Sequence, residues 1–122
     1  FSIFGDDRLI LISDSMMATG MPNGDYSLGG LDVKVTGRLA TLEDGTIAGS
    51  ATNLMECMKT AVKQMEIPLE SAVKCATINP AKAIGEDRDY GSISVGKFAD
   101  LLLLKQDTLE LQTVISHGTV VS

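Results

Sequence analysis

The fold is decided by the stretch Leu9-Ile10-Leu11-Ile12-Ser13-Asp14-Ser15-Met16-Met17-Ala18-Thr19-Gly20. Four apolar residues lead directly into Ser-Asp-Ser, and a loop that contains glycine follows. A short apolar run bounded by polar residues is typical of a strand covered on both faces, as in parallel α/β sheets and barrels. Asp14 then stands at the carboxyl end of this predicted strand, where such folds carry their catalytic groups. The alternative interpretation is that the Asp14 carboxylate only caps a turn.

Composition restricts the class of protein. The 122 residues are 44% hydrophobic, which is typical of a globular domain, and only 4% aromatic, so the core must be aliphatic. The net charge is -6 and the 10 Lys and Arg residues are scattered, so we expect no nucleic acid partner. No apolar run approaches the length of a membrane span, so we expect no membrane partner.

Cysteine and histidine usage argues against a metal site or a disulfide framework within the chain. Cys57 and Cys75 lie among apolar residues in helix-like segments, which favours buried thiols in a reducing compartment over a disulfide. His117 is the only histidine, and we expect it in an exposed turn rather than at a metal. We therefore predict no metal ligands among these residues.

Residues 25–46 are predicted to form a small antiparallel sheet. Apolar side chains alternate with polar ones along 25–28 and again along 31–36, with Gly29-Gly30 between the two runs. Gly37-Arg38 turns the chain into a return strand that ends at Asp44-Gly45. Loops that elaborate the active end of a barrel often take this form, so we interpret this block as an excursion from the first strand.

The segment Ile47-Ala48-Gly49-Ser50 is interpreted as the entry to a helix over residues 51–65, with Ser50 as its N-cap. Small residues allow the backbone to come close to a ligand, and the first N–H groups of a helix are free donors. Ile47, Ala48 and Gly49 are therefore candidates for ligand binding. The alternative is an ordinary helix end that binds only water. A stripe of Leu54, Met58, Ala61 and Met65 marks the face of this helix that packs in the core.

Two shorter helices are predicted to follow. Pro68 precedes a helix over residues 69–77, whose inward face carries Leu69, Ala72, Val73 and Ala76. Asn79 is expected to cap a second helix over residues 81–84, with Pro80 in its first position. Gly85 is expected to end this helix in the left-handed conformation.

The chain is predicted to end in a β layer. A short strand and turn are expected over 91–97 and a second strand over 99–104. A hairpin of 111–116 with 119–121 is expected across the turn His117-Gly118. Such a tail does not fit inside a parallel sheet, and we interpret it as a separate small β layer.

Two motifs resemble a known superfamily. The segment Gly91-Ser92-Ile93-Ser94-Val95-Gly96-Lys97-Phe98-Ala99-Asp100-Leu101 resembles the G-x-I-x-x-G-x-x-A-D-L signature of the amidohydrolase superfamily. Asn79-Pro80-Ala81 with Gly85 is similar to its N-P-A-x-x-x-G helix. In that superfamily a metal-dependent (β/α)8 barrel is flanked by a small β-sandwich, and the first motif forms strands of the sandwich.

A narrower resemblance begins at the opening stretch. Ser13 to Gly24, the hairpin with Tyr26, Leu28 and Gly29-Gly30, and Asp44 to Ser50 resemble the N-acetylglucosamine-6-phosphate deacetylase family. The resemblance implies an α/β fold and a C-terminal piece of a longer enzyme, called the parent enzyme below. Residues 1–90 would be the end of the (β/α)8 catalytic barrel, with strand eight, a β-hairpin insertion and the last helices. Residues 91–122 would be the C-terminal strands of the β-sandwich.

The resemblance also implies a site. Asp14 would act as general base and then general acid, taking a proton from the attacking water beside a divalent metal and giving it to the leaving amine. Ile47, Ala48 and Gly49 would contact the substrate. The metal, of the zinc or iron class, would be held by a Glu and two His residues in the missing N-terminal part of the same enzyme. That part would also hold the sugar phosphate, so we expect the fragment alone to be inactive.

For the parent enzyme, the resemblance implies hydrolysis of the acetamide of N-acetylglucosamine 6-phosphate to glucosamine 6-phosphate and acetate. It further implies a cytoplasmic homodimer in amino-sugar metabolism. Two alternatives stay open at this point. The parent enzyme could be another amidohydrolase that cleaves a cyclic amide or a different amide, or the chain could be a non-catalytic interaction module.

Overall fold

A computed structural model describes residues 1–122, with three helices and seven strands. The chain divides into two compact units, one of residues Leu11–Met65 and one of Phe1–Ile10 with Glu66–Ser122. None of the helices has the length and apolar character needed to cross a membrane.

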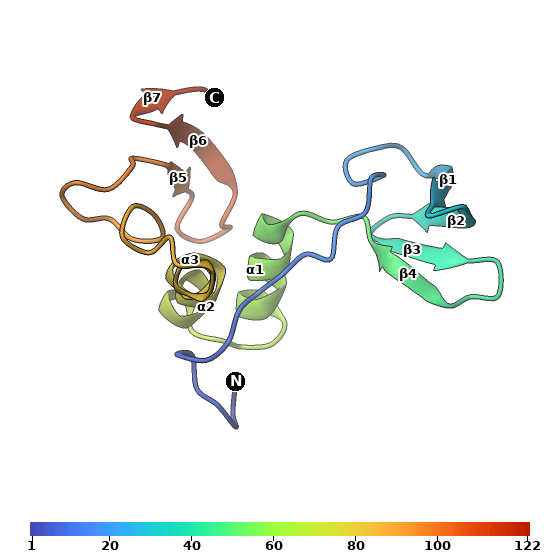
Figure 1. The fold of residues 1–122 in the computed structure, drawn as a ribbon, viewed down its shortest axis with the longest axis horizontal. Helices are drawn as coiled ribbons and strands as arrows, with labels where there is room; N and C mark the ends of the chain where they lie inside the picture. Colours follow the sequence, from blue (N-terminus) through green and yellow to red (C-terminus); the bar gives the residue numbers. More distant parts are fainter. The chain divides into compact units, whose positions relative to one another are not determined.

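The unit Leu11–Met65 is built on a four-stranded antiparallel sheet in the order β1-β2-β3-β4 (Figure 1). Residues Tyr26 and Val33 pair between the first two strands, and Val35 pairs with Ala40 between the second and third. The turns lie where Gly29-Gly30, Gly37-Arg38 and Asp44-Gly45 predict them, which confirms the antiparallel block. The strands are β1 Gly24–Leu28, β2 Leu31–Thr36, β3 Leu39–Leu42 and β4 Ile47–Ser50.

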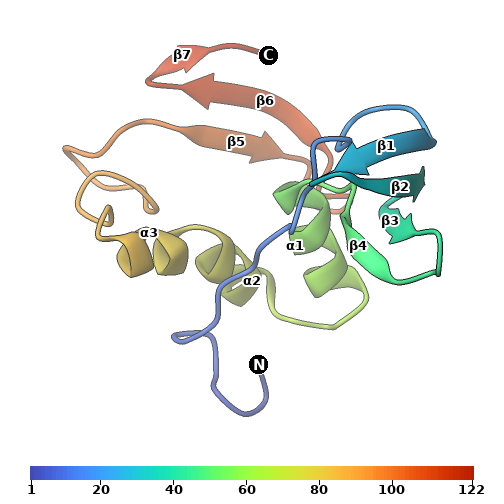
Figure 2. The same ribbon diagram turned by 45° about the vertical axis from the view of Figure 1, so that its right-hand side comes forward.

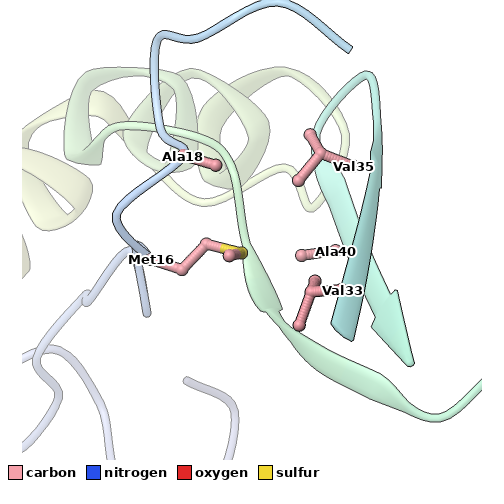
Figure 3. Close-up of a cluster of buried hydrophobic side chains, with 5 residues drawn as sticks. All are labelled: Met16, Ala18, Val33, Val35 and Ala40. Atoms are coloured by element: carbon pink, nitrogen blue, oxygen red, sulfur yellow. The ribbon is translucent and has the colours of Figure 1, made fainter. Parts of the chain in front are cut away.

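One face of this sheet carries the core of the unit. Val33 and Val35 are each 1% exposed because alternate residues of β2 point to the same face. Figure 3 shows Met16 and Ala18, from the loop after Asp14, facing these valines and Ala40. The loop is therefore held to the sheet by apolar burial. The predicted alternation fails at Leu31, which is 56% exposed at the start of β2.

The strand predicted for residues 9–12 does not form, and this prediction is wrong. Ile10 and Ile12 are 43% and 71% exposed, and residues 9–13 take part in no backbone–backbone hydrogen bond. The stretch makes its one sheet-like contact further on, as a parallel bridge between Ser15 and Ser50. A strand exists only by pairing with a neighbour, and the apolar run 9–12 has no paired strand beside it here.

Helix α1, Leu54–Lys63, starts later than predicted. Its N-cap is Asn53, whose side-chain oxygen accepts a hydrogen bond from the Glu56 N–H at 3.0 Å. Ser50, the predicted cap, instead lies at the end of β4 and its hydroxyl accepts from the Thr52 N–H at 3.0 Å. The start at Asn53 follows from the Asn-x-x-Glu spacing, which places a cap and a first-turn carboxylate together. Met58 and Ala61 are buried as predicted, whereas Met65 is 65% exposed beyond the helix.

In the other unit, α2 Leu69–Ala76 and α3 Ile78–Ile84 follow each other closely (Figure 2). The inward face of α2 differs from the prediction, since Ala72 and Cys75 are buried but Leu69 and Val73 are each 38% exposed. Helix α3 ends at Gly85 in the left-handed conformation, with φ 78°, as predicted.

Asn79 lies inside the first turn of α3 and is not its N-cap, which corrects the prediction. The side chain is buried, and its amide nitrogen donates to the carbonyl oxygens of Asp6 at 2.6 Å and Leu9 at 2.7 Å. The Asp6 carboxylate in turn accepts hydrogen bonds from Ser71 and Lys74, each at 2.8 Å. Residues 6–9 are therefore tied to α2 and α3 by polar contacts.

The C-terminal β layer is a three-stranded antiparallel sheet in the order β5-β6-β7 (Figure 2). Its strands are β5 Leu101–Leu104, β6 Leu111–Ser116 and β7 Thr119–Val120. The hairpin across His117-Gly118 is confirmed, and both turn residues have positive φ, as a tight two-residue hairpin turn requires. The Asp100 carboxylate accepts from the His117 N–H at 2.7 Å and so fixes this turn.

The predicted strand over residues 91–97 is absent, with Ile93 86% exposed and Val95 fully exposed. Its first residue has a different role, because Gly91 packs directly on α3. A Cβ at Gly91 would lie 2.9 Å from both the Ala81 Cβ and the Ile78 Cα, and φ there is +86°. The segment is thus placed by contact with a helix and not by a strand partner.

Replacing Asn79 with alanine should lower the free energy of unfolding by about 1–3 kcal/mol, because two partly buried carbonyl oxygens lose the donor of a buried side chain. Urea titration measures the change. Asn23→Ala is the matched control, since Asn23 accepts one exposed hydrogen bond from the Gly37 N–H and should cost no more than about 1 kcal/mol. An Asn79→Ala loss no larger than that of the control would contradict the anchoring role.

Acid should weaken the contact of residues 6–9 with α2. The pKa of Asp6 lies below its ordinary value, first because Lys74 donates a hydrogen bond and then because Ser71 does. A lowered native pKa stabilises the fold fully above the unfolded pKa of about 4, and this contribution is lost as pH falls through the native value. Asp6→Asn should therefore flatten the fall in stability below about pH 4, and Lys74→Met should flatten it similarly. An unchanged acid limb in both variants would show that the pair contributes nothing.

Candidate active site

Asp14, the predicted catalytic residue, has an exposed side chain on a main chain in the left-handed region, with φ 51°. Few residue types other than glycine adopt this conformation, and aspartate is one that does so at low cost. The Asp14 carboxylate has no hydrogen bond or ion pair to another residue of the chain. Its side chain is therefore free to meet a ligand, while its backbone conformation needs support from neighbours.

That support comes from β4. The Ser50 N–H donates to the Asp14 carbonyl oxygen at 2.9 Å, and the Ser50 carbonyl oxygen accepts from the Met16 N–H at 2.9 Å. These two bonds are the parallel bridge between Ser15 and Ser50. The Ser15 hydroxyl adds a hydrogen bond to the Thr52 carbonyl oxygen, at 2.5 Å. Asp14, Ser15 and Met16 are thus fixed to the end of β4 and to Thr52 just after it.

We call the two hydrogen bonds of Ser50 to Asp14 and Met16 the backbone clamp. Gly49 lies next to this clamp and is buried. Its φ is +152°, and a Cβ built on it would lie 3.4 Å from the Asp14 carbonyl oxygen and 3.9 Å from the Met16 Cβ. Two segments predicted to share a site, Asp14 and Ile47 to Gly49, are therefore brought together through their main chains.

The other two candidates, Ile47 and Ala48, lie before Gly49 at the start of the same strand. Ile47 is 67% exposed and pairs with Thr41 of β3, while Ala48 is half-buried. The segment is strand β4 and not the N-terminus of a helix, so the predicted row of free helical N–H donors is wrong. Helix α1 begins only after Asn53.

The loop from Met16 to Gly24 is ordered around the site by its own contacts. Thr19 and Met21 donate from their N–H groups to the carbonyl oxygens of Met16 and Ala18, each at 3.0 Å. The Tyr26 hydroxyl donates to the Pro22 carbonyl oxygen at 2.7 Å. Two buried apolar side chains and these turns hold the loop beside Asp14.

Two carboxylates near β4 in sequence, those of Asp44 and Glu56, are used structurally. Glu56 accepts from Lys59 and Arg38, each at 2.7 Å, and its pKa is lowered first by the Lys59 hydrogen bond. The pKa of Asp44 is lowered by the hydrogen bond from the Thr46 N–H. Both groups stabilise turns and helix ends, which sets them apart from Asp14.

The residues present do not fit a metal on their own. The chain contains no group of three or more His, Cys, Asp or Glu side chains that could hold a metal ion. His117 lies in the β6–β7 turn of the other unit, where it contacts Phe98 and Asp100. Asp14 is the only predicted site residue with an ionisable side chain, and one carboxylate does not make a metal site.

Sequence reasoning missed the part that Ser50 and Ser15 play in holding Asp14. Backbone hydrogen bonds have no residue-type signature, because every residue except proline has both an N–H and a carbonyl. One signal was nevertheless present: the Asn53-x-x-Glu56 cap places the helix start after residue 53 and leaves residues 47–50 to be something other than its entry.

Comparison with known proteins finds relatives along almost the whole chain. The Amidohydrolase family model matches residues 10–121. The chain is 37% identical to an N-acetylglucosamine-6-phosphate deacetylase of Bacillus subtilis over 116 residues, which cover 95% of this chain and 29% of that protein. It is 31% identical to a putative N-acetylgalactosamine-6-phosphate deacetylase of Escherichia coli strain K12, covering 95% of this chain and 69% of that protein.

Solved structures agree. The N-acetylglucosamine-6-phosphate deacetylase of Pasteurella multocida matches with a TM-score of 0.88 and 32% identity, over 93% of this chain and 30% of that one. A mutant of the Mycobacterium smegmatis enzyme, in complex with N-acetyl-D-glucosamine-6-phosphate, matches with a TM-score of 0.86 and 36% identity, over 95% and 31%. The chain thus spans less than a third of the Bacillus relative and of both structures. Its fold is that of the matching part of these enzymes, and it belongs to the amidohydrolase family.

Proposed function

We propose that this chain is part of an enzyme that hydrolyses the acetamide of N-acetylglucosamine 6-phosphate, giving glucosamine 6-phosphate and acetate. The observation that carries the proposal is the clamp that joins Asp14 to β4, next to Ile47, Ala48 and Gly49. It brings the proposed proton carrier together with the proposed substrate-contacting segment. The family match and the deacetylase relatives support the same reaction class.

Asp14 carries the acid–base chemistry in this proposal. As a carboxylate it accepts a proton from the water that attacks the acetamide carbonyl, and it then donates that proton to the leaving amine. Such positioned proton transfer contributes about 10²–10⁴-fold to a rate. The exposed side chain on a fixed main chain suits this role, since the carboxylate can reach the substrate while the Asp14 backbone stays in place.

In the parent enzyme, a divalent metal of the zinc or iron class would bind the attacking water and lower its pKa. Its ligands are expected outside these 122 residues, as are the groups that hold the sugar phosphate. In this proposal residues 1–90 complete the catalytic barrel and residues 91–122 belong to the flanking sandwich. The proposed setting is a cytoplasmic homodimer, and the two free thiols, Cys57 and Cys75, suit a reducing compartment.

N-acetylgalactosamine 6-phosphate is the second candidate substrate. The relative from Escherichia coli that is 31% identical is named for that sugar, which differs from the first only in the configuration at C4. A deacetylase acts at C2, so the same Asp14 chemistry serves both sugars. Contacts to the C4 hydroxyl then decide between them.

Asp14→Asn in the parent enzyme should lower kcat about 10²–10⁴-fold, because the amide cannot carry the proton. Asparagine also tolerates a positive φ, so the fold should persist. Steady-state kinetics together with metal analysis check this prediction. Asp25→Asn, the same charge change on the exposed strand β1, is the control and should retain its activity. Full turnover in Asp14→Asn would refute the proposed role.

A substrate panel tests the proposed reaction itself. The parent enzyme should release acetate from N-acetylglucosamine 6-phosphate with a higher kcat/KM than from N-acetylgalactosamine 6-phosphate or from unphosphorylated N-acetylglucosamine. A site that hydrogen-bonds a hydroxyl or a phosphate discriminates strongly against a ligand that lacks it. The reverse order of the two phosphorylated sugars would favour the second candidate. Cleavage of a cyclic amide in place of all three would refute the deacetylase assignment.

A further inference from the structure

We propose that Gly49 is a positioning residue for Asp14, and that its missing side chain lets β4 hold Asp14 in the left-handed conformation. The inference rests on the proposed function, in which Asp14 carries the proton. It assigns Gly49 an effect on Asp14 that differs from contact with the substrate.

The first support is the local geometry of β4. Its pairing with β3 runs from Ala40 opposite Gly49 to Thr41 opposite Ile47, so Ala48 is an extra residue on β4. Such a bulge bends the strand and changes the direction of the residues beside it. The bulge therefore lies between Ile47, which pairs with Thr41, and the end of β4, where Gly49 and Ser50 pair with β3 and also contact Asp14.

The second support is the backbone of Gly49 itself. A φ of +152° is open to glycine and strained for residues with a Cβ. An alanine would relieve this strain by rotating its own N–Cα bond, and this also reorients the Ser50 peptide that follows. That rotation turns the Ser50 N–H, which is the group that donates to the Asp14 carbonyl oxygen at 2.9 Å.

The third support is the close approach. An added Cβ would lie at contact distance, 3.4 Å, from the Asp14 carbonyl oxygen, and it has the Met16 Cβ 3.9 Å away. Residue 49 is buried, so the methyl group cannot turn out to solvent. At 3.4 Å the contact is ordinary van der Waals packing, so the φ strain is what acts on the hydrogen bond to the Asp14 carbonyl oxygen.

This role predicts a specific kinetic pattern in the parent enzyme. Gly49→Ala should lower kcat about 10–100-fold, since a displacement of about 1 Å at a catalytic group has an effect of that size. KM should change less than about twofold, because substrate contacts along β4 are kept. The effect should vanish in an Asp14→Asn background, because a positioning residue has nothing left to position.

The matched control is Gly45→Ala. Gly45 also has a positive φ, +84°, and lies in the turn just before β4, but a Cβ there meets no atom within 4 Å. It introduces the same kind of backbone strain without touching Asp14, so its kcat should stay near the wild-type value. Hydrogen exchange gives a readout besides activity: the Ser50 amide should exchange faster in Gly49→Ala than in Gly45→Ala.

The outcomes separate this inference from the proposed function. A raised KM with unchanged kcat in Gly49→Ala, or a loss of equal size with and without Asp14, would overturn the positioning role and leave the Asp14 chemistry standing. Full activity of Asp14→Asn alone would instead refute the proposed function. If Gly49→Ala fails to fold, an ester in place of the Ser50 amide removes the same hydrogen bond without adding an atom. That variant should show the same loss of kcat, and full activity would overturn the inference.

Discussion

The local structure around Asp14 depends on two backbone hydrogen bonds that join Ser50 to Asp14 and Met16. They connect the segment after the apolar run to the last strand of the sheet, and no other backbone bonds link that segment to β4. A non-glycine residue in the left-handed region costs about 1–3 kcal/mol, with aspartate at the lower end. Each of the two bonds contributes about 0.5–1.5 kcal/mol, so together they are large enough to offset that cost. The conformation of Asp14 is therefore a consequence of β4.

The two bonds in turn need the apolar contacts beneath them. Met16 and Ala18 are buried against Val33, Val35 and Ala40 (Figure 3). Full burial of a methionine side chain is worth about 1.5–3 kcal/mol, so the packing of Met16 alone is larger than the strain of about 1 kcal/mol expected for an aspartate in this conformation. The loop is held by its side chains and Asp14 by its main chain. This division leaves the Asp14 carboxylate without a hydrogen bond or ion pair to the rest of the chain.

The elements that sequence reasoning predicted correctly are those whose cause is local. Alternation and glycine turns specify β1 to β3, and the turn His117-Gly118 specifies the β6–β7 hairpin. The errors share a different cause. Residues 9–12 and 91–97 have strand-like sequences, but a strand depends on a partner that composition does not reveal. Asn79 resembles a cap by residue type, yet it sits inside α3 because Asp6 and Leu9 offer carbonyl oxygens from far along the chain.

The candidate site shows the same limit in another form. Its residue types, an aspartate and a run of small residues, were visible from the sequence and from the family resemblance. The contact between Asp14 and this run could not be seen from the sequence, because it is made by backbone carbonyl and N–H groups, which almost every residue has. Glycine is the exception, since the absence of a side chain is itself a residue type and can mark a main-chain contact. The proposed proton transfer uses the Asp14 side chain, whereas β4 fixes Asp14 through its main chain. For this reason a change at residue 14 and a change at residue 49 alter separable properties of one site.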